Sequence, residues 1–426
     1  HHVELFGMVR GPAAVPPIVP SVEQVTLIDV SPRSLRGRIY MAADAIVPSV
    51  LRLLPALGVG GLLVLAAVSL PTFFLVGASL AIVGLLVDRH KLRQWISQVL
   101  IKFRNDRAAR WRGRAYAEAA HLMAERISPE AYDVLHCHDV IPLMAGVILK
   151  RRNPSLHLVW DAHELYEEVA TSHPRDRALM REIIFGAQES VGALITINKT
   201  FRTFYRERYA SLPAAQVVMN AVVDAGPVED DGRLRRAAGL APDQQILLFQ
   251  GSLLPHRGLE KLVEAARFLP SRWSIVIMGE GPMAEQVRRA VASLTPLRPR
   301  QRTALTLLPP VPYSELTAWT AGGTLGIIPY EPTGLNHLHC TPNKLWEYPA
   351  AGVPILATAL PEMARLIQDW RMGFLLPLSF CPHDIISALD GIDADDLTSA
   401  RTSCRSFIQA MSWSRFEPDL LEAYKE

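Results

Sequence analysis

The chain has 426 residues, of which 49% are hydrophobic and 20% charged, and this length is too great for one hydrophobic core and suits two α/β domains. Its 44 Lys and Arg residues are nearly balanced by 42 Asp and Glu residues, which excludes the protein-wide basic field of many nucleic-acid-binding proteins. The four cysteines are scattered and form no C-x-x-C pair, which excludes a disulfide framework and indicates a reducing compartment.

Two short strands are predicted near the start of the chain, at residues 2–6 and 24–29. We expect no signal peptide at this N-terminus. Because residue 1 is His and the first strand follows at once, we expect the sequence to begin inside a fold, with something upstream missing.

Residues 53–87 form a run of 35 residues without a charged side chain, which Pro71 and Thr72 divide into halves. A helix of ~17 residues is ~25 Å long, slightly short of the ~30 Å hydrocarbon core of a bilayer. Basic residues such as Arg52 and Arg89 flank the run on both sides, so the positive-inside tendency places both ends in the cytoplasm. We therefore predict a helical hairpin that enters the membrane and returns. The alternatives are an unusually apolar soluble helix pair and a hydrophobic dimer interface.

Residues 88–126 are predicted to form a long amphipathic helix, with apolar residues at three- and four-residue spacing and many basic residues between them. This pattern is typical of a helix that lies against anionic lipid. The alternative is an ordinary amphipathic helix that packs on its own sheet with a solvated basic face. We expect membrane contact through residues 53–114 and a location on the cytoplasmic face of the cell membrane.

Strand-like and helical segments then alternate, which predicts parallel sheets. The predicted domains are an N-terminal Rossmann-like domain at 1–220, a linker at 221–232, a C-terminal Rossmann-like domain at 233–411 and a closing helix at 412–426. The predicted strands are 132–136, 156–160, 193–197 and 216–219 in the first domain, and 246–250, 273–278, 304–308, 324–329 and 353–357 in the second.

Candidate sites follow from this topology, because open parallel sheets bind ligands at the carboxyl ends of their strands. One such junction is residues 251–258, Gly-Ser-Leu-Leu-Pro-His-Arg-Gly, where two glycines allow close backbone approach. Arg257 offers a planar, permanently charged fork for a diphosphate. The alternative is a plain turn with a surface arginine. The other junctions are 136–139, 161–164, 279–281 and 341–347.

The junction at 341–347 is predicted to begin a helix, with Thr341 as its cap and Pro342 in the first helical position. Lys344 lies one turn before Glu347, whose carboxylate could accept hydrogen bonds from sugar hydroxyls. The alternative is a surface salt bridge between these two side chains.

The segment Pro-Asn-Lys-Leu-Trp-Glu-Tyr-Pro-Ala-Ala-Gly-Val-Pro at 342–354 resembles the donor half of the family-4 retaining glycosyltransferases of the GT-B fold, of the bacterial polysaccharide and glycolipid type, and so do residues 251–258 and 279–282. The resemblance spans residues 130–424 and implies two Rossmann-like domains that face each other across a cleft, with the hydrophobic hairpin inserted in the first. Residues 133–138, 161–164, 218–220 and 412–413 resemble other parts of the family's pattern, mainly its acceptor half.

The resemblance implies a role for each matching residue. Glu347 is expected to hold the nucleotide ribose and Arg257 the donor diphosphate, while His138 is expected near the transferred sugar. The candidate catalytic residues are His138, Arg257 and Lys344. The candidate donor-binding residues are Gly251, Ser252, Arg257, Gly279, Glu280, Val311, His339, Asn343, Lys344, Leu345 and Glu347, and His163 and Glu164 are expected on the acceptor side.

The sequence departs from the family pattern at two positions. Ser252 stands where many members carry a phosphate-binding arginine, and His339 stands where the first glutamate of a paired-glutamate motif is expected. We expect Lys344 to supply the missing positive charge.

By this resemblance the protein is a retaining hexosyltransferase that moves a sugar from a nucleoside-diphosphate sugar to a lipid-linked or membrane-proximal glycan acceptor, in polysaccharide or glycolipid biosynthesis. We expect no metal and no other cofactor, because no D-x-D motif ends a strand and the spacing of His136, His138, His337 and His339 is not that of a common zinc site. The alternatives are a nucleotide-sugar epimerase or hydrolase, and a catalytically inactive membrane scaffold of the same fold.

Overall fold

The structure is a computed structural model that describes residues 2–7, 24–29, 112–169, 173–294 and 304–425. The hydrophobic hairpin predicted at 53–87 lies outside these residues, as does most of the basic helix predicted at 88–126. The described end of that helix, residues 112–125, is helical. In the described part of the chain, no helix is both long enough and apolar enough to span a membrane.

The chain forms two compact units. The first comprises residues 1–131, 144–153 and 173–179, and the second comprises residues 132–143, 154–172 and 180–426. The second unit therefore contains every strand of the two larger sheets described below. The contacts that form the candidate site all lie within this unit.

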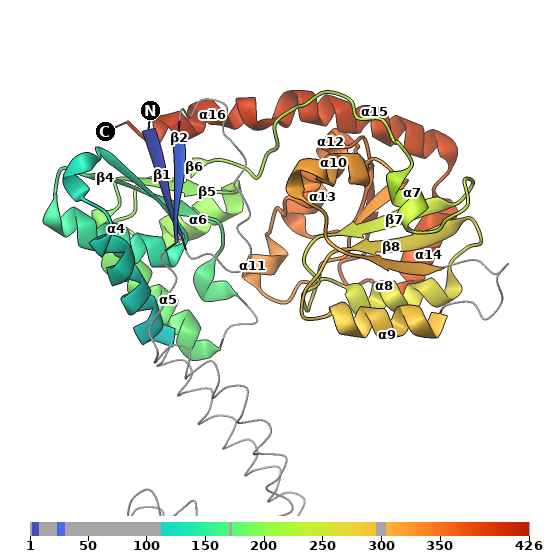
Figure 1. The fold of residues 1–426 in the computed structure, drawn as a ribbon, viewed down its shortest axis with the longest axis horizontal. Helices are drawn as coiled ribbons and strands as arrows, with labels where there is room; N and C mark the ends of the chain where they lie inside the picture. The colour runs from blue at the N-terminus through green and yellow to red at the C-terminus, as the bar shows by residue number, and fades with distance from the viewer. Residues whose placement is uncertain (1, 8–23, 30–111, 170–172, 295–303, 426) are drawn as a thin grey trace, which may run out of the picture. The chain divides into compact units, whose positions relative to one another are not determined.

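The described strands form three sheets, and every strand pair among them is parallel (Figure 1). The six-stranded sheet has the order β12 (Gly373–Leu376), β11 (Ile355–Thr358), β10 (Leu325–Ile328), β7 (Gln245–Gln250), β8 (Trp273–Met278) and β9 (Leu305–Leu308). The four-stranded sheet has the order β3 (Val134–His138), β4 (His157–Ala162), β5 (Ala193–Thr196) and β6 (Gln216–Val217), and β1 (His2–Gly7) pairs with β2 (Gln24–Asp29).

All the strands predicted from the sequence are present, shifted by a few residues at most, and β12 is an additional strand that the sequence analysis missed. The helices that connect the strands are α4 (Val140–Arg152), α5 (Pro174–Ala187), α6 (Lys199–Arg208), α7 (Arg233–Ala237), α8 (Leu259–Ala265), α9 (Ala284–Leu294), α10 (Tyr313–Thr320), α11 (Leu335–Leu338), α12 (Lys344–Ala350), α13 (Pro361–Trp370), α14 (Pro382–Gly391), α15 (Ala394–Met411) and α16 (Trp413–Glu422).

The six-stranded sheet is buried on both faces. Along β7, Ile246 and Leu248 enter one hydrophobic core, and Leu247 and Phe249 enter the other. Helices α12, α13 and α15 supply the first core, and helices α8, α9 and α14 supply the second (Figure 1). Burial on both faces explains why these strands are continuous apolar runs in the sequence.

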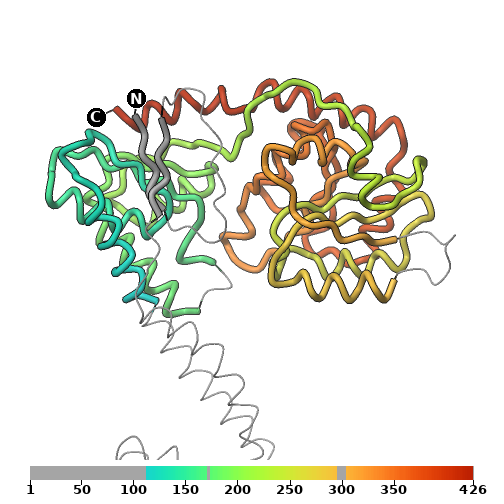
Figure 2. The backbone as a smooth tube through the Cα atoms, viewed as in Figure 1, coloured from blue at the N-terminus to red at the C-terminus, as the bar shows by residue number. Residues whose placement is uncertain are grey.

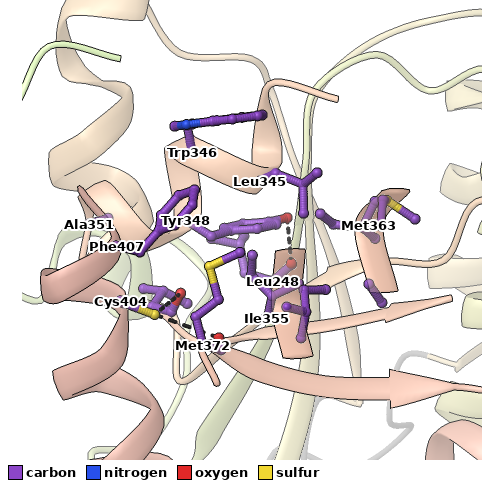
Figure 3. Close-up of a cluster of buried hydrophobic side chains, with 14 of the residues drawn as sticks. Leu248, Leu345, Trp346, Tyr348, Ala351, Ile355, Met363, Met372, Cys404 and Phe407 are labelled. Carbon is purple, nitrogen blue, oxygen red and sulfur yellow. Dashed lines mark hydrogen bonds between the residues drawn. The ribbon is translucent and has the colours of Figure 1, made fainter. Parts of the chain in front are cut away.

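The first of these cores fixes the position of α12 (Figure 3). The hydroxyl of Tyr348 donates a hydrogen bond to the carbonyl of Leu248 at 2.9 Å, and the indole of Trp346 donates to the carbonyl of Met411 at 3.1 Å. The rings of Trp346 and Phe407 have centroids 5.9 Å apart. Because α12 is anchored to both β7 and α15, the residues at its start have defined positions.

The C-terminal helix α16 runs beside the four-stranded sheet (Figure 2). Ala423, just after this helix, packs with Val159 and Ile195 of that sheet. The hydroxyl of the neighbouring Tyr424 lies 2.7 Å from Nδ1 of His136. The segment 412–426, predicted as a closing helix, contains α16.

Candidate active site

Two cationic side chains meet at the carboxyl end of the six-stranded sheet. Nζ of Lys344 lies 3.1 Å from the hydroxyl of Tyr330, and Nη1 of Arg257 donates a hydrogen bond to the same hydroxyl. The guanidinium carbon of Arg257 also lies 4.8 Å from the centre of the Tyr330 ring, within cation–π range. Lys344 is the first residue of α12, Arg257 precedes α8, and Tyr330 follows β10. Three separate elements therefore bring the two positive charges and the tyrosine hydroxyl together.

Among the described residues, no carboxylate forms an ion pair with either positive charge, although Lys344 is only 6% exposed. The Nε–H of Arg257 is buried and has no hydrogen-bond partner in this part of the chain. Unpaired buried charge and an unmade hydrogen bond both raise the free energy of the protein, so the arrangement suits an anionic ligand with several acceptor oxygens.

Gly251 makes room for the ammonium group of Lys344. This glycine follows β7 with φ +102°, and a Cβ at its position would lie 3.0 Å from Nζ of Lys344. Ser252 beside it is exposed. Gly279 is buried after β8 and donates its N–H to Leu308, whereas the side chain of Glu280 is exposed. The predicted glycine-rich junctions therefore line the same edge of the sheet as the two cations.

One carboxylate oxygen of Glu347 is hydrogen-bonded within the protein, and the side chain as a whole is half-exposed. Its Oε2 accepts a hydrogen bond from Nε2 of Gln250 at 3.0 Å, and Oε1 of Gln250 accepts one from Thr320 at 2.7 Å. The alternative of a surface salt bridge between Lys344 and Glu347 is not observed among the described side chains, because Lys344 turns to Tyr330 instead. The free side of the carboxylate can accept hydrogen bonds from a ligand's hydroxyls.

The start of α12 differs from the prediction. The helix begins at Lys344 with Asn343 as its cap, and no side chain caps it. Thr341, the predicted cap, is buried, its hydroxyl has no hydrogen-bond partner in the described structure, and its carbonyl accepts a hydrogen bond from Asn220 at 3.0 Å. The prediction of Thr341 as the cap is therefore wrong. Pro342 and Asn343 lie between Thr341 and the first residue of the helix.

Three other predicted donor-site residues take different positions. The side chain of Leu345 is fully buried in the core (Figure 3), Asn343 is exposed, and Val311 is half-buried in the loop after β9. The structure therefore gathers Arg257, Lys344 and the glycine turns at one point but directs the side chain of Leu345 away from it.

His339 borders a cavity of about 360 Å³. Its carbonyl accepts a hydrogen bond from Asn198 at 2.9 Å, and its buried Nδ1 has no partner among the described residues. The lining mixes apolar and polar groups, so the cavity could accommodate a polar organic molecule. The residues around it are Leu165, Lys199, Thr200, Thr203, Phe204, Glu207, Leu335 and His339.

A second group of polar side chains lies at the carboxyl ends of β3 and β4. Oδ2 of Asp161 lies 3.3 Å from Nε2 of His136, 3.3 Å from Nδ1 of His138 and 3.2 Å from Nε2 of His163. Parallel pairing aligns His138 with Asp161, which brings the two strand ends together. We call these four residues the histidine cluster.

The electrostatics of the histidine cluster follow from burial and this shared carboxylate. Burial alone would raise the pKa of Asp161, but hydrogen bonds from the three histidines lower it well below its usual range. Burial lowers the pKa of His136, whereas for His163 the effect of burial is outweighed by Asp161, so that its pKa is raised. Asp161 is therefore an anion over the physiological pH range.

Glu164 follows this cluster and lies within electrostatic range of the donor-side cation Arg257. Burial, and secondly the charge of Asp139, raise the pKa of Glu164, while Arg257 opposes the shift. The backbone carbonyl of Glu164 accepts a hydrogen bond from Tyr205 at 2.6 Å. The predicted acceptor-side residue therefore lies near the predicted diphosphate-binding residue within the second unit.

The sequence analysis missed Tyr330 and Gln250. Tyr330 follows the strand predicted at 324–329, so the same rule about carboxyl ends could have identified it. Gln250 is the last residue of β7 and only 1% exposed, and its polar side chain at the end of an apolar strand was an available signal.

Comparison with known proteins agrees with this geometry. Residues 244–392, most of the six-stranded sheet and its helices, match the model of the family described as "Glycosyl transferases group 1". A D-inositol 3-phosphate glycosyltransferase of Nocardioides sp. is 26% identical over 332 residues, which cover 71% of this chain and 69% of that protein. The protein of the same name from Actinosynnema mirum is 28% identical over 329 residues, which cover 72% of this chain and 75% of that protein.

Solved structures share the fold at low sequence identity. Sucrose-phosphate synthase from Thermosynechococcus elongatus superposes with a TM-score of 0.57 at 16% identity, over 73% of this chain and 78% of that chain. HepE of Anabaena, in complex with UDP-glucose, superposes with a TM-score of 0.56 at 14% identity, over 72% of this chain and 81% of that chain. The chain therefore has the GT-B fold of these structures, and its residues 244–392 are similar to the group 1 glycosyl transferases.

Proposed function

We propose that the protein transfers a sugar from a nucleoside-diphosphate sugar to an acceptor hydroxyl, with retention of configuration at the anomeric carbon. The observation that carries this proposal is the convergence of Arg257 and Lys344 on the hydroxyl of Tyr330, with no carboxylate partner for either cation among the described residues. The two cations are placed to bind the donor diphosphate, and the half-exposed Glu347 to bind the ribose. Structures of similar fold contain UDP and UDP-glucose, which supports a uridine nucleotide as the first donor to test.

The two cations would act on the leaving group. In the proposed step, the bond between the anomeric carbon and the β-phosphate oxygen breaks, and its electron pair stays with the diphosphate. The acceptor oxygen bonds to the anomeric carbon on the same face, and its proton moves to the diphosphate. Arg257 and Lys344 stabilise the developing charge as preorganised donors, and His138 contacts the transferred sugar. Donor binding is then independent of an added divalent cation.

The acceptor is proposed to be lipid-linked or membrane-proximal, at the cytoplasmic face of the cell membrane. The uncharged run at 53–87 supports this proposal. The relatives named D-inositol 3-phosphate glycosyltransferase favour a second candidate, a phosphorylated polyol. Assays with a membrane extract and with soluble polyol phosphates distinguish the two. Transfer to the soluble acceptor alone, at full rate in a variant without residues 53–87, would refute the membrane acceptor.

The domain assignment follows the same proposal. Residues 1–220 form the acceptor domain, residues 221–232 the linker and residues 233–411 the donor domain. An epimerase, a hydrolase and an inactive scaffold are less favoured, because the similar proteins are named as transferases and synthases.

Donor binding can be tested by calorimetry with UDP, GDP and ADP on the full chain in detergent. We expect one nucleotide to bind. Arg257→Ala and Lys344→Ala should each weaken its binding by about 1.5–3 kcal/mol, because each removes charge-assisted hydrogen bonds. Addition of EDTA or Mg²⁺ should leave the affinity unchanged.

The matched control is Arg288→Ala, which removes an exposed arginine on α9 whose ion-pair partner in the described part of the chain is its helical neighbour Glu285. This variant should keep the native affinity. Equal affinities of all three variants for the bound nucleotide would contradict the placement of the donor site. Retention of configuration is tested separately, by NMR of the anomeric proton of the product.

A further inference from the structure

We infer that the histidine cluster is a zinc site. Among the described residues, His136, His138 and Asp161 are the one group of three or more potential metal ligands whose donor atoms lie within 4.8 Å of one another. His163 lies next to this group, with its Nε2 3.1 Å from Nδ1 of His138 and 3.2 Å from Oδ2 of Asp161, but its donor atom is not within 4.8 Å of all three. Three imidazole nitrogens and one carboxylate oxygen form a donor set that zinc favours.

Most of the measured distances suit ligands around one ion. With zinc–ligand bonds of ~2.0–2.1 Å, the donor atoms of a tetrahedral site are roughly 3.3–3.4 Å apart. Four of the six pairs among the donor atoms of the cluster are in contact, at 3.1, 3.2, 3.3 and 3.3 Å. To complete a four-ligand site, His163, which lies outside the group of three, must also approach His136.

Hydrogen bonds alone do not satisfy this arrangement. If His138 Nδ1 and His163 Nε2 both carry protons to donate to Asp161, two N–H groups face each other at 3.1 Å. If either nitrogen is an unprotonated acceptor, its contact with Asp161 places a lone pair against a carboxylate oxygen. A cation at the centre resolves the conflict, because all four atoms can then direct lone pairs at it.

The surroundings of the cluster orient the ligands. Nδ1 of His136 lies 2.7 Å from the hydroxyl of Tyr424, which fixes this ring and leaves Nε2 directed at Asp161. Zinc-binding histidines commonly use their second nitrogen in this way. The rings of His136 and His138 are also stacked, with centroids 4.2 Å apart. The site would tie the ends of β3 and β4 to the C-terminal segment after α16.

This zinc is separate from the proposed donor chemistry. The ligands lie on β3 and β4 or directly after β4, whereas Arg257 and Lys344, which are proposed to bind the diphosphate, lie before α8 and at the start of α12. Nδ1 of His138 is the atom directed at the cluster, which leaves Nε2 for the sugar contact proposed above. The two proposals can therefore fail independently.

The test is a zinc titration of the full chain, without a polyhistidine tag and freed of metal by chelation, in competition with a chromogenic chelator. We expect one Zn²⁺ per chain. His136→Gln and His163→Gln should each abolish the binding of this one Zn²⁺. Tyr424→Phe should weaken zinc binding roughly 10–100-fold, because the variant loses the hydrogen bond to Nδ1 of His136. Co²⁺ should give the intense visible absorption of a tetrahedral ion in the native chain and not in the two histidine variants.

The control is His383→Gln, which removes an exposed imidazole on α14 and should leave zinc binding unchanged. Far-UV circular dichroism and the midpoint of urea denaturation report whether every variant is folded, independently of zinc and of nucleotide. His163 is the second variant because its side chain is 42% exposed and its loss should not disturb folding. The proposal is overturned if the native chain binds no stoichiometric zinc, or if folded His163→Gln and His136→Gln chains retain it.

Discussion

The hydroxyl of Tyr348 shows how one buried side chain supports the candidate donor site. It donates to the carbonyl of Leu248 and accepts a hydrogen bond from the backbone N–H of Gln250 at 3.2 Å. The side chain of Gln250 in turn holds Glu347. A hydroxyl on α12 therefore fixes the end of β7, and the end of β7 fixes the carboxylate that we propose binds the ribose.

Tyr348→Phe should lower the free energy of unfolding by about 1–3 kcal/mol, because it leaves a buried N–H and a buried carbonyl without this partner and changes little else. Urea denaturation followed by tryptophan fluorescence measures the loss. Tyr313→Phe is the matched control, since Tyr313 is 59% exposed, and it should change stability by less than ~0.5 kcal/mol. Equal losses for the two variants would show that the Tyr348 hydroxyl has no special role.

At the scale of the element, the loop from β7 to α8 is shaped by the contact between Gly258 and β10. Gly258 has φ +70°, and a Cβ there would lie 2.0 Å from the carbonyl oxygen of Pro329. This approach places Arg257, the preceding residue, beside Tyr330, the residue after Pro329. The shape of the backbone thus determines where the guanidinium meets the tyrosine hydroxyl.

Gly258→Ala and Gly352→Ala separate this contact from backbone strain. Both glycines have φ +70°, but a Cβ on Gly352 would meet nothing within 4 Å. Gly352→Ala should therefore cost only the left-handed strain of about 1–2 kcal/mol. Gly258→Ala should cost clearly more in urea denaturation and should also weaken nucleotide binding. If the two variants are equally stable and bind nucleotide equally, the contact with Pro329 does not shape the site.

The elements were predictable where burial imposes a simple pattern. Strands such as β7 and β8 are apolar because helices cover both faces of their sheet, so their positions follow from the sequence. The strand β12 is only four residues long, and its Gly-Phe-Leu-Leu segment carries too little pattern to identify. The cap of α12 was assigned to Thr341 because local propensity cannot show that Asn220 engages its carbonyl.

The candidate site was predictable in part for the same reason. Arg257 and Lys344 were identified from their motifs, and the structure brings them together. The histidine cluster could not be assembled from the sequence, because it depends on the register that pairs His138 with Asp161 across a helical connection. The spacing of residues along the chain does not show that Asp161 and His163 lie next to the two histidines of β3.

At the scale of the whole molecule, the linker 221–232 is attached to the C-terminal helices. The backbone N–H of Trp413 donates to the carbonyl of Val222 at 2.8 Å. Asp224 accepts two hydrogen bonds from Arg405 of α15, at 2.6 and 2.9 Å. These contacts, all within the second unit, restrict the segment that joins the four-stranded sheet to α7.

The pair between Asp224 and Arg405 should make stability depend on pH. Hydrogen bonds from Arg405, and secondly from the backbone of Gly226, lower the pKa of Asp224. A carboxylate whose pKa is lower in the folded than in the unfolded chain adds stability above its unfolded pKa of ~3.9, and this contribution disappears as the pH falls through the folded value. Arg405→Met should therefore cost about 0.5–1 kcal/mol at neutral pH and less near about pH 3.

Urea denaturation of the native chain and the variant at both pH values measures this difference. Arg415→Met is the control, because Arg415 pairs with Asp419 inside a single helix and is 57% exposed. Its effect should be smaller at neutral pH. A loss for Arg405→Met that stays constant between the two pH values would mean that packing of its alkyl stem, and not its charge, attaches the linker to α15.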